Sequence, residues 1–230
     1  MDAPPTLRAV RSWDEAEIPE RASDEGALEA MLLSVGAKGY DKATVQEVLE
    51  RSGISRDRFQ RRFGGKEACF AQAYEMAADR LCAEVLEAGR EAESWRAGFR
   101  AALARLLRTV AEQPLLAKAL LIEVRAARGQ AWAKHQQLIE RFARAVDSAR
   151  REPSARPTTT ALTAQFVVGA IEEAIATEIG AGRTVTVERL LPDLAHLAVL
   201  NYFGEDEAWL ELRSPELAAV EPMAPVEPGE

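Results

Sequence analysis

Residues 44–63 read TVQEVLERSGISRDRFQRRF, and they predict two short helices joined by a turn. Thr44 can accept a hydrogen bond from the backbone amide of Glu47 while Glu47 reaches back, which makes a capping box at the start of the first helix. Gly53 follows the last residue of that helix, and Ser55 offers an N-cap for the second. The stretch therefore predicts a helix-turn-helix arrangement.

The apolar residues of this stretch are spaced so that one side of each helix is buried against the other. They are Val45, Val48, Leu49, Ile54 and Phe59. The free face of the second helix carries Arg56, Asp57, Arg58, Gln60, Arg61 and Arg62. Arginine forks pair with guanine edges or with phosphates, so this face suits DNA. From the spacing alone, a helical hairpin with a charged surface is the alternative.

Charge is distributed unevenly along the chain. The net charge of -8 excludes a protein that coats nucleic acid indiscriminately, yet residues 38–66 hold eight basic and four acidic residues. The last 27 residues hold eight acids against Arg213 alone. We therefore expect a disordered, acidic, Pro-rich tail over 213–230 and a flexible arm over 1–22.

Composition indicates a globular protein, because 47% of the 230 residues are hydrophobic and 29% are charged. Lys118 and Glu123 interrupt the apolar stretch at 115–124, so we expect no membrane span. The chain opens without a secretory signal, and a cytoplasmic location is expected. Cys69 and Cys82 are too few for a disulfide framework or a four-ligand metal site, and no cofactor is predicted.

The rest of the chain is rich in Ala, Leu, Glu and Arg and lacks the alternation of strands, so the predicted fold class is all-α. We expect a DNA-binding domain over 23–88, which includes the start of a linking helix, and a helical ligand-binding and dimerisation domain over 89–212. The helices predicted for the larger domain span 94–111, 114–128, 130–151, 159–180 and 187–203.

Residues 29–74 resemble the DNA-binding domain of TetR/AcrR-type transcriptional regulators. The resemblance rests on the helix-turn-helix together with Gly39-Tyr40 before it and the run from Lys66 to Phe70, with Tyr74, after it. Two positions depart from the family pattern, since Gln60-Arg61-Arg62 stands where Tyr-x-His is usual and Leu49 stands where Ala is favoured.

The resemblance implies a DNA-binding regulator, and most simply a repressor that releases a palindromic operator when a small-molecule effector binds. Thr44 and Lys66, each at a helix start, would hold phosphates. The complete set of predicted DNA contacts is Thr44, Gln46, Ser55, Arg56, Arg58, Gln60, Arg61, Arg62 and Lys66.

Each of the final two predicted helices carries apolar residues on more than one side. This pattern favours burial between two subunits of a homodimer over burial in a large monomer core. The predicted interface residues are Phe166, Ala170, Ala174, Leu194, Leu197, Ala198 and Asn201. The residues that could line an effector pocket are Trp95, Phe99, Glu123, Trp132, His135, Phe142 and Phe166. The alternative is ordinary core packing for each aromatic residue, a surface position for His135, and pairing with Arg125 or Arg128 or solvent exposure for Glu123.

Catalysis is not expected, because the sequence contains neither the nucleophile elbow of hydrolases nor a phosphate-binding loop. The two histidines, His135 and His196, do not form the repeated Glu-x-x-His motif of di-iron bundles. The competing hypothesis is a helical ligand-sequestering or protein-interaction module that has lost DNA binding. DNA affinity and its salt dependence would distinguish the two.

Overall fold

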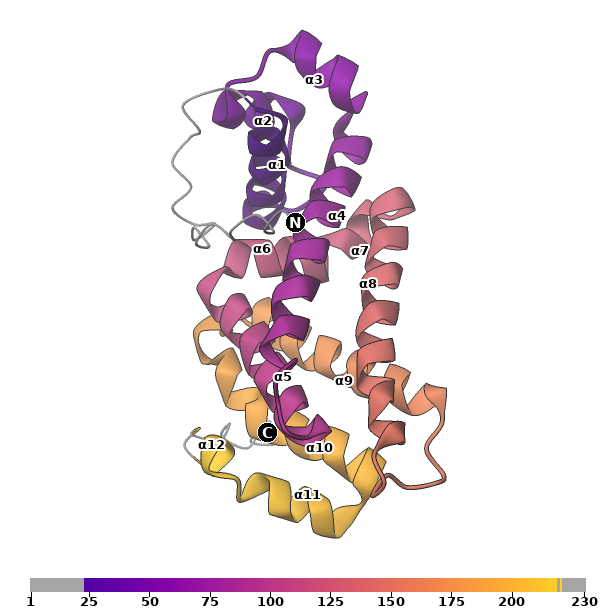
Figure 1. The fold of residues 1–230 in the computed structure, drawn as a ribbon. Coiled ribbons are helices and arrows are strands. Elements are labelled where there is room, and N and C mark those ends of the chain that lie inside the picture. Colours follow the sequence, from indigo (N-terminus) through magenta and orange to yellow (C-terminus); the bar gives the residue numbers. More distant parts are fainter. Residues whose placement is uncertain (1–22, 219, 221–230) are drawn as a thin grey trace, which may run out of the picture.

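The computed structural model describes residues 23–218 and residue 220; the arm predicted over 1–22 lies outside them. Every regular element in that part of the chain is a helix, which confirms the all-α prediction. The first four are α1 (Asp24–Lys38), α2 (Val45–Ser52), α3 (Arg56–Phe63) and α4 (Lys66–Ala88). In Figure 1 these form the small upper part, and α4 continues from it into the larger lower part.

The small part has its own apolar core. Met31 and Val35 of α1, Phe59 of α3 and Phe70 of α4 are all buried in it. The core continues into the larger part through residues of α6, of the turn that follows it and of α8, so the two parts are packed together. None of the helices in residues 23–218 is both long enough and apolar enough to cross a membrane.

The larger part contains α5 (Trp95–Glu112), α6 (Pro114–Lys118), α7 (Val124–Ala127), α8 (Gly129–Asp147), α9 (Ala161–Gly180) and α10 (Leu191–Phe203). Its core is formed mainly by α5, α9 and α10. Two short helices complete it, α11 (Glu205–Leu212) and α12 (Pro215–Ala218), which lie at the lower end in Figure 1.

Three segments differ from the prediction. The helix expected over 114–128 is interrupted by a π turn, Ala119–Glu123, which takes one more residue per turn than an α-helix. The helix expected over 187–203 is 3-10 from Thr184 to Leu190, and α10 then has Pro192 in its first turn, where the missing amide leaves no helical bond unmade. The expected tail begins with ordered α12, because Leu217 is buried in the core; residues 221–230 lie outside the described chain.

Candidate DNA-binding surface and ligand cavity

The turn between α2 and α3 is built by local hydrogen bonds. The Thr44 hydroxyl accepts from the Glu47 amide at 3.3 Å, and the Glu47 carboxylate accepts from the Thr44 amide at 3.3 Å, so the predicted capping box is present. Gly53 adopts a left-handed conformation, with φ of 69°, that a residue with a Cβ rarely adopts. Ser55 then caps α3 by accepting from the Arg58 amide at 3.2 Å. This geometry fixes how α3 projects from the domain.

The projecting face of α3 is exposed and basic. All five predicted contacts on it lie at the surface, namely Arg56, Arg58, Gln60, Arg61 and Arg62, whereas Phe59 and Phe63 on its other face are buried. Gln46 of α2 is also exposed and accepts a hydrogen bond from Arg56 Nη2 at 2.7 Å, so α2 holds one guanidinium group of α3. The structure thus gathers these side chains on one surface.

Lys66 has a partner within the chain. Its Nζ donates to the carbonyl oxygens of Tyr40 and Asp41, the latter at 3.4 Å, and lies 4.3 Å from the centre of the Tyr40 ring. The ammonium group therefore fastens the start of α4 to the loop before α2. Its predicted phosphate contact stays a prediction.

A cavity of about 510 Å³ lies between the last turns of α4 and α8, the first part of α5 and the first half of α9. Three of the predicted ligand residues line it: Trp95 and Phe99, whose rings stack with centres 5.0 Å apart, and Phe142. Val168 and Ile171 close it from α9. This volume falls in the range of drug-sized pockets, and the walls are mostly apolar.

Polar groups of the cavity come from residues that the sequence analysis did not select. Arg90 and Arg151 are exposed residues of its lining, and Glu152 accepts a hydrogen bond from the Trp95 amide at 3.3 Å. Arg90 lies in the turn after α4, and Arg151 ends the segment predicted as a helix over 130–151. Only their position in the folded chain places them at the cavity.

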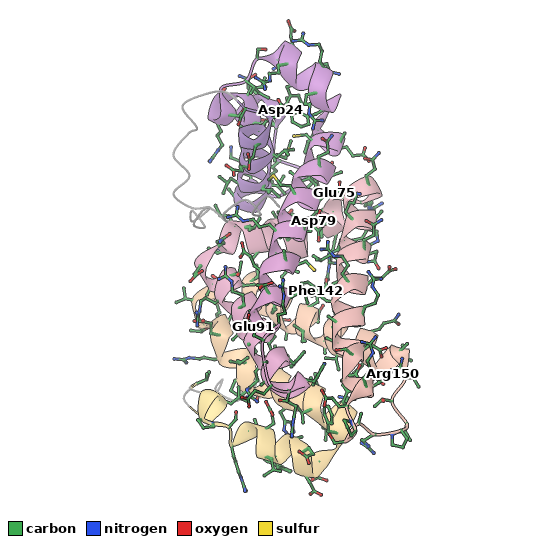
Figure 2. The ribbon with its side chains drawn as sticks, viewed as in Figure 1. Asp24, Glu75, Asp79, Glu91, Phe142 and Arg150 are labelled. Carbon is green, nitrogen blue, oxygen red and sulfur yellow. The ribbon has the colours of Figure 1, made fainter. Side chains whose placement is uncertain are left out.

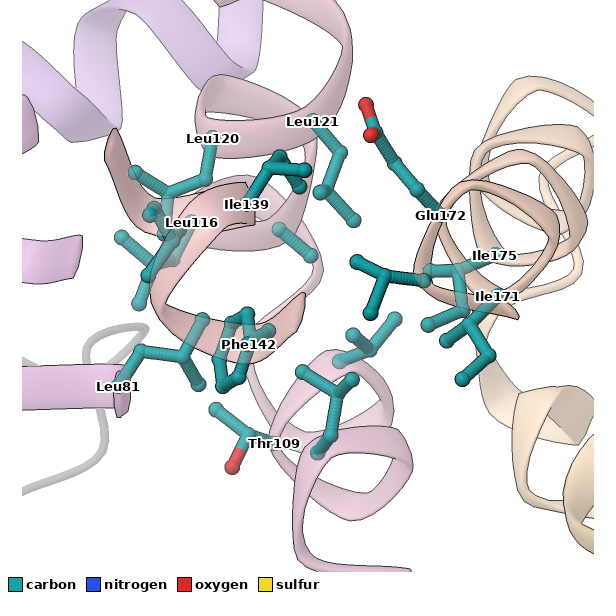
Figure 3. Close-up of a pocket in the computed structure, with 15 residues that line it drawn as sticks. Leu81, Thr109, Leu116, Leu120, Leu121, Ile139, Phe142, Ile171, Glu172 and Ile175 are labelled. Atoms are coloured by element: carbon teal, nitrogen blue, oxygen red, sulfur yellow. The ribbon is translucent and has the colours of Figure 1, made fainter. Parts of the chain in front are cut away.

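A second, smaller cavity of about 60 Å³ lies deeper in the same domain. Figure 3 shows apolar side chains converging on it, with Phe142 and Ile171 among them. Both residues also line the larger cavity. Phe142 is therefore part of the partition between the two spaces.

His135 and Trp132 do not line either cavity. His135 is 1% exposed, and its Nδ1 lies 3.0 Å from the Tyr74 hydroxyl of α4 while its Nε2 lies 3.2 Å from Glu172 Oε1 of α9. Trp132 is at the surface and stacks on the His135 ring. Burial works to raise the pKa of the Glu172 carboxyl, but hydrogen bonds from His135 and Arg125 outweigh it and lower that pKa. His135 thus joins three helices.

Glu123 connects the two parts of the molecule. Its Oε2 accepts from the Tyr40 amide at 2.8 Å, and its Oε1 lies 3.9 Å from Lys118 Nζ. The sequence suggested pocket lining, pairing with a nearby arginine or solvent exposure. In the structure, the Glu123 carboxylate instead binds the loop that follows α1.

The predicted interface residues divide into two groups. Phe166 is 57% exposed on α9, and it shares a surface hollow with Leu162, which is 68% exposed, and with Asn201 of α10. Ala170, Ala174 and Leu197 are partly exposed. Leu194 and Ala198 are instead buried within the chain, because they turn toward the core formed with α5 and α9. Phe166 therefore lies on the exposed face of α9 and does not line the 510 Å³ cavity.

Comparisons with known proteins agree with this geometry. Residues 29–73 match the family model for bacterial regulatory proteins of the tetR family. FadR of Bacillus halodurans, a fatty acid degradation regulator, has a similar fold with a TM-score of 0.69, at 13% identity over 77% of this chain and 98% of that one. FadR of Bacillus subtilis, solved in complex with stearoyl-CoA, has a TM-score of 0.69 at 14% identity over the same shares.

A TetR-like regulator from Rhodococcus sp. RHA1 has a TM-score of 0.59 at 23% identity, over 78% of this chain and 96% of that one. No curated protein matches the sequence significantly. At these identities the structural matches establish the fold, and the family model covers the helix-turn-helix that carries the basic face of α3. Residues 29–73 therefore match the helix-turn-helix domain of the tetR family, and the fold of the described chain is similar to that of solved TetR-like transcriptional regulators.

Proposed function

We propose that this chain is a ligand-responsive repressor that binds a palindromic operator as a homodimer. The observation that carries the DNA-binding role is the exposed, arginine-rich face of α3, held out by the capped turn that follows α2. The second helix of a helix-turn-helix enters the major groove, where its first residues meet base edges. Arg56 and Arg58 occupy those positions.

The outer face of α9 supports the dimer. Leu162 and Phe166 expose large apolar side chains one turn apart, and Gly169 lies one turn further on the exposed side. Such a face is stable in water when a second copy covers it. A two-fold dimer that presents its two α3 helices on one side would set them against successive major grooves, which lie about 34 Å apart. A palindromic operator follows from that symmetry.

The cavity supports an effector with a long apolar part and an anionic group. Its aromatic and aliphatic walls favour the apolar part. Arg151 offers charge to an anion, and so does Arg90, whose exposed ion pair with Glu87 can exchange for a ligand anion. The stearoyl-CoA held by FadR of Bacillus subtilis has this combination of parts. An acyl compound is accordingly the effector class that we propose for this chain.

Helix α4 provides the route from effector to operator. Val85 and Leu86 in its last turns line the cavity, Lys66 at its start fastens the loop before α2, and Tyr74 between them is tied to α8 through His135. From Tyr74, the helix extends about 12 Å to Lys66 and about 16 Å to Val85, at 1.5 Å per residue. A shift at the cavity end therefore moves the start of α4 by a comparable distance in the opposite direction.

The experiment that tests the DNA-binding role is selection of duplexes from a random-sequence pool by the purified protein, followed by sequencing. We expect a palindrome. An Arg58→Ala variant should lose affinity for it while remaining a dimer. Folded, dimeric protein that enriches no sequence would contradict the proposal and favour the ligand-sequestering or protein-interaction module.

The effector proposal is tested with the selected operator. Acyl-CoA esters and free fatty acids of increasing chain length are titrated by calorimetry and by release of operator. Ala102 lines the cavity, so Ala102→Trp should fill it and abolish both signals while leaving operator affinity unchanged. Release that persists in this variant would place the effector site elsewhere.

A further inference from the structure

Asp24, the first residue of α1, makes an ion pair with the face of α3 that we assign to DNA. Its Oδ1 accepts from Arg58 Nε at 2.9 Å and lies 2.9 Å from Arg58 Nη2, and its Oδ2 lies 3.2 Å from Arg62 Nε. In Figure 2, Asp24 is labelled at the end of α1 beneath α3. One carboxylate thus joins two guanidinium groups that lie one helical turn apart.

The two arginines are held to different degrees. Arg62 also donates from Nη1 to Gln72 Oε1 of α4 at 2.9 Å, and its guanidinium lies 5.1 Å from the centre of the Phe63 ring. Arg62 is therefore fastened from α1 and from α4. Arg58 lies nearer the start of α3, where helix-turn-helix proteins meet base edges, and Asp24 gives its fork a fixed direction.

We propose that Asp24 is a specificity-determining positioning residue for the DNA-binding activity proposed above. An unrestrained arginine binds phosphate in any duplex, and that attraction is independent of sequence. A carboxylate in contact with Arg58 and Arg62 offsets part of this general attraction. It also fixes the direction of the Arg58 fork, and base recognition depends on that direction. Asp24 therefore lowers affinity for arbitrary DNA more than affinity for the operator.

The exposure of the pair leaves Arg58 accessible to DNA while Asp24 contacts it. The side chains of Arg58 and Asp24 are 47% and 36% exposed, so the outer edge of the guanidinium can meet a phosphate or base without the ion pair being broken. Asp24 also lies in the first turn of α1, where the helix dipole favours a negatively charged side chain.

The test compares Asp24→Asn with a matched control, Glu25→Gln. Glu25 is the next residue in the same first turn of α1 and is exposed, so the control removes the same charge from the same helix end. Binding to a labelled duplex of arbitrary sequence and to the selected operator is measured by fluorescence anisotropy across a salt series. Circular dichroism and sedimentation confirm that both variants keep the fold and the oligomeric state of the parent.

We expect Asp24→Asn to tighten binding to the arbitrary duplex by about two- to tenfold at low salt, as the loss of two exposed ion pairs allows. The slope of log affinity against log salt should steepen by about 1, because one more phosphate contact forms. Operator affinity should change less, so the ratio of operator to arbitrary binding falls. Glu25→Gln should leave the ratio and the slope as they are.

Two further variants connect the effect to the arginines. Asp24→Glu restores the charge and should recover most of the ratio, and in an Arg58→Ala background Asp24→Asn should no longer steepen the slope. An unchanged ratio in Asp24→Asn, or an equal fall in Glu25→Gln, overturns this inference and leaves the proposed function intact. A parent protein that enriches no sequence from the random pool overturns both.

Discussion

Gly36 allows α1 of the small part to approach α6 of the larger part closely. The variant Gly36→Ala tests whether that contact joins the two parts. A Cβ built on Gly36 would lie 2.1 Å from the carbonyl oxygen of Leu115 and 3.0 Å from its Cα. Both atoms belong to the backbone, so no side chain can rotate to make room. Ordinary contact begins at 3.4 Å, which means that the helices must separate by about 1 Å.

The size of the effect follows from two opposing terms. Alanine favours a helix over glycine by about 1 kcal/mol. Overpacking of a well-packed contact costs about 1–3 kcal/mol, and a clash between two backbones belongs to the upper part of that range. We therefore expect Gly36→Ala to lower the free energy of unfolding by about 1–2 kcal/mol, the difference of the two terms.

The assay is urea unfolding followed by circular dichroism, with all proteins at one concentration because dimerisation would make stability depend on it. Gly180→Ala is the matched control, since Gly180 ends α9 and a Cβ there would meet nothing within 4 Å. That variant should be neutral or more stable by about 0.5 kcal/mol. A Gly36→Ala protein that is as stable as the parent or more stable would refute the reasoning, because the contact with Leu115 would then cost no more than the gain in helix propensity of about 1 kcal/mol.

Three other predictions concern Glu172, the α9 face and a buried thiol. The lowered pKa of Glu172 means that its stabilisation is present above the ordinary carboxyl value of 4.5 and is lost as pH falls through the folded-state pKa. Stability measured against pH should therefore fall less steeply below pH 4.5 in Glu172→Gln than in the parent, and Glu173→Gln, which alters an exposed neighbour, should follow the parent. Phe166→Glu should convert the proposed dimer to a monomer in sedimentation. The control Leu210→Glu, at an equally exposed leucine of α11, should leave the dimer intact. A dimer that survives Phe166→Glu would exclude the α9 face as the dimer interface. Burial raises the pKa of the Cys69 thiol to about 12. We therefore expect Cys69 to react with a disulfide reagent at pH 8 only after the protein unfolds. Rapid labelling of the folded protein would contradict the burial of this thiol.

The helix-turn-helix was predictable because its signals are local. The capping box at Thr44, the left-handed Gly53 and the cap at Ser55 each act within four residues, so each can be read from the sequence and each is present in the structure. Patterning of the same kind located α5 and α9 to within a few residues. It did not anticipate the π turn at 119–123, which has no sequence signal of comparable strength.

The contacts of the candidate sites were less predictable because they join residues far apart in the chain. Asp24 and Arg58 are 34 residues apart, and Tyr74 and His135 are 61 residues apart, so no spacing rule connects either pair. The aromatic residues of the cavity were selected for their chemistry, yet Trp132 has the same chemistry and lies at the surface. Which aromatic side chain faces the cavity depends on the rotation of each helix against its neighbours.

The buried polar contacts of His135 add directional interactions to the apolar packing of the larger part. Apolar packing fixes the distance between helices but is not directional, and around the larger cavity much of that packing is missing. The hydrogen bonds that link Tyr74, His135 and Glu172 are directional, and they set the positions of α4, α8 and α9 relative to one another without help from side chains in the cavity. Directional contacts of this kind fix the relative positions of helices where a cavity removes part of the apolar packing between them.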